Sequence, residues 1–187
     1  MLIEPPLTGE RTYLHGADIL DALVAATGAE SDLGLVLRVA GDCAIEALPG
    51  PPDAAACGRF RYRRGGRDHQ LVLRHRPDRP IARRLVGDDA RLVAGAELEC
   101  DRATQPAGTP GGILQRAVAL ALALLERPHP EDYWSIAEID CRVAPPADGA
   151  LAVAVQPRLG GRFWRAAVAV DGGPLGTVLL ARGQPRR

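Results

Sequence analysis

The sequence contains no lysine: all 23 of its basic residues are arginine. Twenty-three aspartates and glutamates balance them, so the formal net charge is zero at pH 7. A chain without net charge has no global attraction for nucleic acid or for an anionic membrane, and we predict neither as a partner. Because Ala, Gly and Pro are abundant, the lack of lysine indicates genomic base composition rather than a chemical requirement.

Cysteine is scarce, and no Cys-x-x-Cys pair or histidine at metal-ligand spacing accompanies it. We therefore predict no metal site and no resident cofactor. Three of the four cysteines lie in or beside strand-like segments, so we expect small buried thiols in a reduced cytosol. The four are Cys43, Cys57, Cys100 and Cys141.

Long hydrophobic runs are missing too. The N-terminus, Met-Leu-Ile-Glu-Pro-Pro, has neither a basic region nor an apolar run of signal length, so we expect no secretion signal and a cytoplasmic protein. The apolar run over residues 117–125 is shorter than the roughly 20 residues that span a bilayer. With 187 residues, 47% of them hydrophobic, the chain can bury a core in one ordinary domain or two small ones.

One helix is predicted over residues 109–125, and it is apolar on nearly every side. No polar residue separates Arg116 from Glu126, so other elements must wrap around this helix. The segments that follow alternate or run apolar at strand length. These are Trp134–Val143, Ala150–Gln156, Gly161–Val170 and Leu175–Ala181. A long antiparallel sheet curled around a central helix is the α+β arrangement of the hot-dog fold, which we predict here.

The first half of the chain follows a similar order. A short strand is predicted over Arg11–Gly16 and a helix over Ala17–Ala26, closed by Gly28. Consecutive glycines at 65 and 66 predict a tight hairpin turn. Residues 76–90 are predicted to form a linker, and Arg91–Cys100 a further strand. The other predicted strands are Leu33–Ala40, Cys43–Leu48, Arg59–Arg64 and His69–Arg74.

The shared order predicts two hot-dog units in tandem, over residues 1–80 and 81–187. A faint internal echo favours this: Gly58-Arg-Phe-Arg leads to Gly65-Gly66, much as Gly161-Arg-Phe-Trp leads to Gly172-Gly173. The alternative is a single hot dog with an N-terminal extension.

Residues 72–182 resemble the 3-hydroxyacyl-carrier-protein dehydratases of fatty acid synthesis, which belong to the hot-dog superfamily. The order and spacing of several short motifs carry the resemblance. They are Leu73-Arg-His-Arg-Pro, Arg91-Leu-Val-Ala-Gly-Ala-Glu-Leu, Pro110-Gly111 with Ile113-Leu114, Ile139-Asp-x-Arg-Val-x-x-Pro, Asp148-Gly-Ala-Leu-x-Val, Gly161-Arg-Phe-Trp and Val170-Asp-Gly-Gly-Pro-Leu.

The catalytic positions of that family are changed in the C-terminal half. The family has a histidine nine residues before the glycine that starts the helix and a carboxylate five residues after it. Counted from Gly111, these positions are Arg102 and Arg116 in this chain. Arginine stays protonated in proteins, so neither residue can act as base or acid. We therefore predict that the C-terminal half is catalytically silent by itself.

The first helix offers other candidates. Asp21 lies five residues after Gly16, as the acid of the family does, and His15 directly precedes that glycine. The resemblance implies a catalytic His15/Asp21 couple, although acids near a helix start are also favoured by the helix dipole. Thr109 and the amides of Gly111 and Gly112 are predicted to bind a thioester carbonyl, because a helix N-terminus exposes unpaired N–H groups; an ordinary helix cap is the alternative.

Two functions remain open at this point. The first is an acyl-thioester enzyme, a 3-hydroxyacyl dehydratase or, as a variant, a thioesterase. The second is a non-catalytic acyl-binding or scaffold protein. In the first, the predicted partner is acyl carrier protein or coenzyme A, and the ten arginines of residues 59–84 could dock either one or simply be solvated. We expect a homodimer, or an internal pseudo-dimer if the chain is a tandem.

Overall fold

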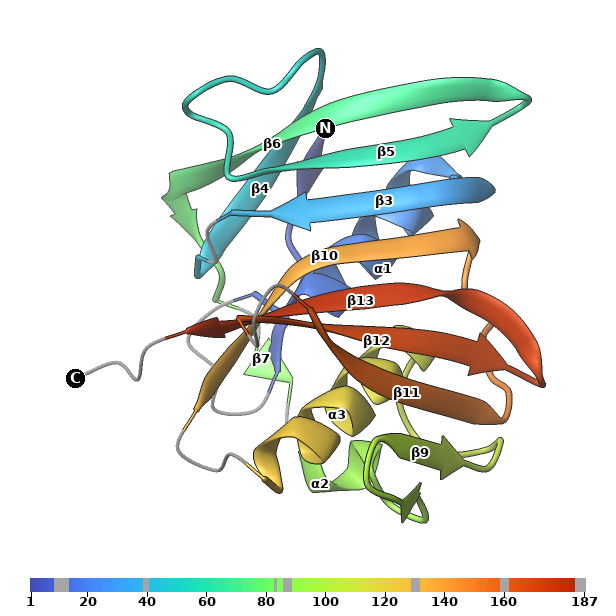
Figure 1. Cartoon of the computed structure of the whole chain (residues 1–187). Helices are drawn as coiled ribbons and strands as arrows, with labels where there is room; N and C mark the ends of the chain where they lie inside the picture. Colours follow the sequence, from blue (N-terminus) through green and yellow to red (C-terminus); the bar gives the residue numbers. More distant parts are fainter. Residues whose placement is uncertain are drawn as a thin grey trace. The chain divides into compact units, whose positions relative to one another are not determined.

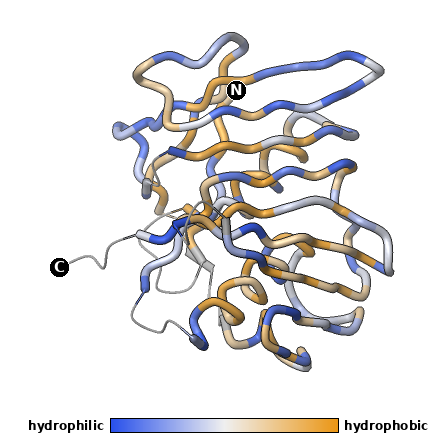
Figure 2. Tube along the Cα trace, viewed as in Figure 1, coloured by the Kyte–Doolittle hydropathy of each residue, from blue (hydrophilic) through white to orange (hydrophobic). Residues whose placement is uncertain are grey.

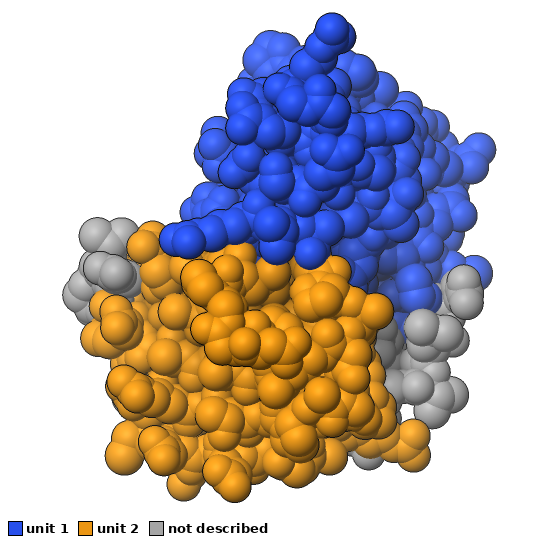
Figure 3. Space-filling view, turned by 90° about the vertical axis from the view of Figure 1, so that its right-hand side faces the viewer, with its two compact units in different colours: residues 1–87, 138–144 blue, residues 88–137, 145–187 orange. Residues whose placement is uncertain are grey.

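The computed structural model describes residues 1–8, 14–38, 41–82, 84–85, 89–128, 132–158 and 162–183. They divide into two compact units (Figure 3). Unit 1 holds residues 1–87 and 138–144, and unit 2 holds residues 88–137 and 145–187. Strand β10 (Tyr133–Val143) contributes residues to both units. The predicted division between residues 80 and 81 lies within unit 1.

Unit 1 combines one helix, α1 (Gly16–Thr27), with an antiparallel sheet of strand order β1-β4-β6-β5-β3-β10 (Figure 1). A short parallel pair joins β2 (Leu7–Thr8) to β7 (Arg84–Leu85). The sheet strands that lie wholly in unit 1 are β1 (Leu2–Ile3), β3 (Ser31–Leu37), β4 (Cys43–Pro49), β5 (Gly58–Arg64) and β6 (Arg67–Pro80).

The predicted first helix is confirmed as α1. Its buried side includes Ile19, Leu20 and Leu23, which follow the spacing of one helix face. Gly28 ends the helix with φ of +63°, a left-handed conformation in which its N–H reaches the carbonyl of Val24. The hairpin at Gly65 and Gly66 is confirmed as well, since both have positive φ and Arg64 pairs with Arg67 across the turn.

Unit 2 contains the other long helix, α3 (Ile113–Glu126), and the strand order β10-β13-β12-β11-β9-β8. The short helix α2 (Asp89–Leu92) packs against α3. The remaining strands are β8 (Glu97–Leu98), β9 (Arg102–Gln105), β11 (Leu151–Arg158), β12 (Phe163–Val170) and β13 (Gly173–Gly183).

The predicted apolar helix is confirmed as α3, which packs against β11 and β9 (Figure 1). Most of its residues are buried, and its path through unit 2 is coloured largely as hydrophobic in Figure 2. Every second residue of β11 faces the same core, beginning at Leu151. Burial of this continuous apolar surface is the main force that holds unit 2 together.

Two of the predicted elements are wrong. Arg91–Cys100 is not a strand: it contains the end of α2, a turn at Gly95 with φ of +69°, and the two-residue strand β8. The linker predicted from residue 76 begins too early, because β6 continues to Pro80. Its last residues pair only with β4, since β5 pairs no further than Leu73, and a proline without an N–H donor is tolerated at such a free edge.

The remaining differences are smaller. Strand β9 was not predicted. Of the predicted strand Arg11–Gly16, residues 11–13 lie outside the described residues, Leu14 and His15 are not in a strand, and Gly16 already belongs to α1. Of the cysteines, Cys43, Cys57 and Cys141 are buried free thiols, as expected, whereas Cys100 is exposed.

Candidate functional site

His15 occupies the N-cap of α1. Its backbone is extended, with φ of −82° and ψ of 140°, and the helix begins at the next residue. The side chain is buried, with 7% of the residue exposed. The start of the helix and the surrounding protein therefore fix the position of this imidazole.

Asp21 lies six residues, about 1.7 turns, further along the same helix and is exposed. Desolvation by the surrounding protein, and then the negative charge of Asp18, raise the pKa of Asp21 from 3.8 to about 6. Asp18 is three residues away and therefore a neighbour on the helix surface. The carboxyl group of Asp21 thus meets solvent while the protein around it disfavours its charged form.

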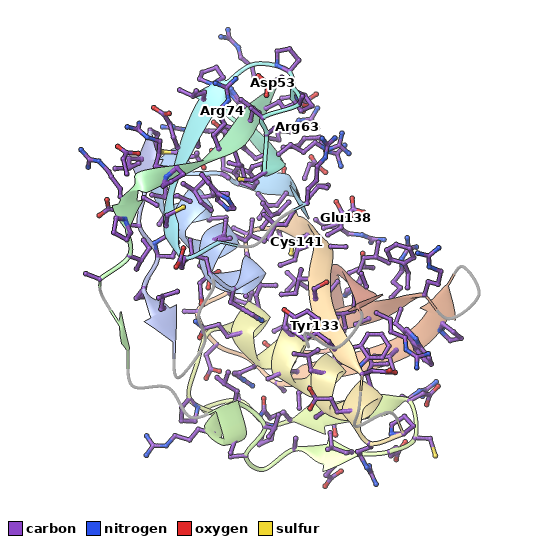
Figure 4. All side chains as sticks on the ribbon, turned by 90° about the vertical axis from the view of Figure 1, so that its left-hand side faces the viewer. Asp53, Arg63, Arg74, Tyr133, Glu138 and Cys141 are labelled. Atoms are coloured by element: carbon purple, nitrogen blue, oxygen red, sulfur yellow. The ribbon has the colours of Figure 1, made fainter. Side chains whose placement is uncertain are left out.

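Asp21 acts electrostatically on Cys141, which lies on β10 in the same unit (Figure 4 labels Cys141). Burial, followed by the charges of Asp140 and Asp21, raises the pKa of the Cys141 thiol to about 12. Asp21 is therefore close enough to β10 for its charge to act there.

The spacing of His15 and Asp21 determines what the couple can do. Six residues correspond to about 9 Å along a helix axis and to different sides of the helix. A reaction that uses both groups would need a substrate that extends over this separation. The structure places the two predicted residues on one helix, His15 at its N-cap and Asp21 within it.

Arg116 stands in the place of the family carboxylate on α3 and is completely buried. Its Nε donates to Gln105 Oε1 at 2.9 Å, and its Nη1 donates to Asp148 Oδ1 at 2.9 Å. Its Nη2 donates to the carbonyls of Pro106 and Gly149 at 3.0 and 3.2 Å. These bonds use four of the five N–H groups of the guanidinium, so Arg116 holds the start of α3 to two loops.

Asp148 completes this network. Its Oδ2 accepts the N–H of Gly108 at 2.7 Å. Hydrogen bonds from the N–H groups of Gly149 and Gly108, together with Arg116, lower the pKa of Asp148 below its ordinary value. Arg116 and Asp148 therefore fix both sides of the turn that leads to the predicted substrate-binding residues.

Thr109, Gly111 and Gly112 follow that turn at the start of α3. Thr109 donates its hydroxyl to the Pro106 carbonyl at 3.0 Å. Gly112 is the N-cap, and its N–H donates to Gln115 Oε1 at 3.1 Å. The local contacts are those of an ordinary helix cap, so a bound carbonyl would have to replace Gln115 as the acceptor.

Gly111 is required by its backbone and by its surroundings. Its φ is +101°, and a Cβ atom there would lie 2.4 Å from Leu92 Cδ2. We predict that Gly111→Ala lowers the free energy of unfolding by about 2–3 kcal/mol, from backbone strain and steric overlap together. Gly108→Ala is the matched control, because its φ of +78° is also left-handed but nothing lies within 4 Å. Urea unfolding measures both, and equal losses would exclude the contribution of Leu92.

Comparison with solved structures identifies the fold. A fusion DH domain matches with a TM-score of 0.50 at 15% identity, over 94% of this chain and 80% of that one. The dehydratase domain of PpsC from Mycobacterium tuberculosis, in complex with C12:1-CoA, matches with a TM-score of 0.49 at 16% identity, over 91% and 85% of the two chains. No family model matches the chain, and a search of curated proteins finds no match.

The chain has the hot-dog fold. A candidate thioesterase from Novosphingobium aromaticivorans is also similar, with a TM-score of 0.48 at 14% identity over 100% and 94% of the two chains. The predicted α+β class and hot-dog fold are confirmed by the match to the fusion DH domain. The tandem arrangement stays a prediction.

The two arginines at the predicted catalytic positions lie in different surroundings. Arg102 is exposed on β9, and Arg116 is buried in the network described above. Neither is a group from which a proton can be taken at neutral pH. Arg116 is therefore a structural cation at the start of α3.

The arginines of residues 59–84 are largely engaged by nearby acids. Five of them form ion pairs, and Arg64 donates to the Thr27 carbonyl at 2.7 Å. Figure 4 labels one such pair, Arg74 with Asp53. Docking of an acidic partner here, which stays a prediction, would compete with these contacts. The other pairs are Arg61 with Asp140, Arg63 with Asp32 and Asp68, Arg76 with Glu46 and Asp78, and Arg79 with Glu4.

Two further features concern the described residues alone. Within them, no three His, Cys, Asp or Glu side chains gather as a metal ion would require. None of their helices is both long and apolar enough to cross a membrane.

Proposed function

We propose that this hot-dog protein acts on acyl thioesters and dehydrates a 3-hydroxyacyl group. The observation that carries the proposal is Asp21: an exposed carboxyl group with a pKa of about 6, five residues after the glycine that starts its helix. A general acid works best when its pKa lies near the working pH. At pH 7 about a tenth of Asp21 would be protonated and able to donate.

The proposed reaction uses both residues of α1. Neutral His15 removes a proton from C2 of the acyl group. Protonated Asp21 donates its proton to the hydroxyl at C3, which leaves as water while the C2–C3 double bond forms. The products are a 2-enoyl thioester, water, an imidazolium and a carboxylate, and one proton passes from His15 back to Asp21 through solvent to complete the cycle.

For unit 2, a separate thioester-binding site is proposed at the start of α3. The amides of Gly111 and Gly112 and the hydroxyl of Thr109 would bind the thioester carbonyl, with Gln115 displaced from Gly112. The carrier of the acyl group would be coenzyme A or an acyl carrier protein. The proposal includes a homodimer or an internal pseudo-dimer as the working form, a cytoplasmic location, and a place in fatty acid or polyketide metabolism.

Two other functions are kept for specific reasons. A thioesterase would use the same carboxyl group, ionised, to activate water. A non-catalytic acyl-binding or scaffold protein is favoured by Arg116, because this residue fills the predicted acid position of unit 2 and donates four structural hydrogen bonds.

In the test, wild-type protein and a His15→Ala variant are each incubated with 3-hydroxyacyl and with saturated acyl thioesters. Both substrates are supplied on coenzyme A and on acyl carrier protein. Dehydration predicts a 2-enoyl thioester from the first substrate, with a rate that falls about 10²–10⁴-fold in the variant. The matched control is His69→Ala, since His69 is exposed and stacks on Tyr62. Release of free thiol from both substrates would favour the thioesterase, and saturable binding without turnover the scaffold.

A further inference from the structure

A pocket of about 470 Å³ lies at one end of the unit 2 sheet. None of the five predicted site residues lines it. Its volume is within the range of small-molecule sites. It is bordered by β8, by the ends of β9 and β11 and by the turn between β12 and β13, through Gly95, Glu97, Thr104, Gln105, Pro106, Ala150, Leu151, Ala152 and Gly172.

The walls of the pocket are smooth and mainly apolar. Ala150, which precedes β11, and Leu151 and Ala152, which begin it, form one continuous segment of the lining. Gly95 and Gly172 both have positive φ, and no atom lies within 4 Å of the place where a Cβ would stand. Since neither glycine carries a side chain, the pocket keeps open space for a narrow apolar group.

The buried polar residue of the lining is already satisfied. Gln105 is 2% exposed, accepts from Arg116, and donates to the carbonyls of Leu92 and Ala94 at 2.9 and 3.0 Å. It therefore forms a fixed floor and has little capacity left to bind a ligand.

Glu97 and Thr104 are different. They are directly opposite each other in the β8–β9 pair, and both are exposed. Opposite side chains on one face have Cβ atoms about 5 Å apart, so a single small group can reach both. In the part of the chain that the structure describes, neither side chain has a hydrogen bond or ion pair to another residue. Together they present a carboxylate and a hydroxyl oxygen to the pocket.

The charge of the surroundings selects the ligand. No cationic residue lines the pocket, and the β8–β9 hairpin beside it carries Glu99 and Asp101 in its turn, against Arg102 on β9 and Arg127, which donates to the Leu98 carbonyl. An ammonium group is compact and carries three donors, which suits two separate single acceptors. A guanidinium is better matched by two oxygens of one carboxylate in a plane.

We propose that this pocket binds a small primary alkylammonium compound, with the ammonium group between Glu97 and Thr104 and the alkyl chain against Ala150–Ala152. The inference is independent of the reaction proposed above, because it uses none of the same residues. Its failure would leave that reaction untouched.

The test is a titration of the whole protein with pentylammonium, followed by amide NMR shifts. Saturable shifts are expected at residues that line the pocket. Glu97→Gln should weaken binding at least tenfold, and Thr104→Val about threefold. Glu99→Gln, an exposed acid on the same hairpin, is the matched control and should stay within twofold of wild type. Pentanol, which has the same alkyl chain without the charge, should not saturate.

Three results would overturn the proposal. The first is the absence of saturable binding by wild-type protein that folds normally by circular dichroism. The second is an equal loss in Glu97→Gln and Glu99→Gln, which would indicate general attraction to an acidic hairpin. The third is tighter binding of a peptide that presents one lysine than of pentylammonium, which would make the pocket a docking site for a protein side chain.

Discussion

Replacing Arg116 by alanine is expected to lower the free energy of unfolding by about 3–5 kcal/mol. The substitution would leave Gln105 Oε1 and the Gly149 carbonyl without their donor, and the Pro106 carbonyl with the Thr109 hydroxyl alone. It would also remove the cation that neutralises Asp148 and open a cavity at the start of α3. Urea unfolding of the variant and of wild-type protein measures the loss.

Two further variants make the result specific. Arg116→Lys keeps the charge but loses the planar arrangement of donors, so it should lose about 1–3 kcal/mol. Arg61→Ala removes an arginine whose ion pair with Asp140 is 3.7 Å long and about half exposed, and should cost less than about 1 kcal/mol. An Arg116→Ala variant as stable as Arg61→Ala would contradict a structural role for the network.

The hydrogen-bond partners of Arg116 could not be predicted from the sequence. The sequence places an arginine where a related dehydratase has an acid, and so predicts the loss of a catalytic group. It does not reveal that Asp148, 32 residues away, and Gln105 converge on that arginine. Their meeting depends on the register of β11 with β9, which sets Leu151 opposite Gln105.

The longer elements were predictable because their patterns are strong. Helix α3 is apolar over more than two turns, and β10 to β13 each keep an apolar face at strand length. The failures are short segments governed by tertiary contacts. Residues 91–100 alternate well enough for a strand, yet Leu92 packs against Gly111 and its carbonyl binds Gln105. A local pattern cannot compete with contacts of that kind over so few residues.

The candidate site was predictable in position and not in electrostatics. The spacing of His15 and Asp21 along one helix follows from the sequence and the predicted helix start. The raised pKa of Asp21 does not, because it arises mainly from desolvation by parts of the chain that fold over it. The pocket at Glu97 and Thr104 could not be predicted either. These residues face each other because β8 pairs with β9, and β9 was not predicted.

Replacing Asp21 by asparagine is expected to lower kcat/KM for dehydration by about 10²–10⁴. Asparagine has nearly the same shape but no proton to donate to the leaving hydroxyl. In wild-type protein, the acid form is lost as the pH rises through about 6, so the dehydration rate should fall above that pH. Initial rates from pH 5 to 8 measure both effects. Asp101→Asn, which changes an exposed acid of unit 2, should retain the wild-type rate and pH profile.

Asp21→Asn should also stabilise the protein at neutral pH. Because the folded pKa of Asp21 is raised above 3.8, the folded state binds more protons than the unfolded state between these values, and stability falls as the pH rises from about 4 to 6. Above pH 6 the penalty is constant, about 1 kcal/mol once solvent screening of an exposed group is allowed for. Asp21→Asn should remove it, so the variant should be more stable than wild type at pH 8 and equal to it near pH 3.

Activity and stability together separate the two functions. A variant that gains stability at pH 8 and loses dehydration shows a carboxyl group kept at a cost to the fold because the reaction requires it. If the variant gains stability and no thioester reaction changes, the raised pKa is only a consequence of burial. Asp21 would then be no catalyst, and the non-catalytic acyl-binding function would be the one to pursue.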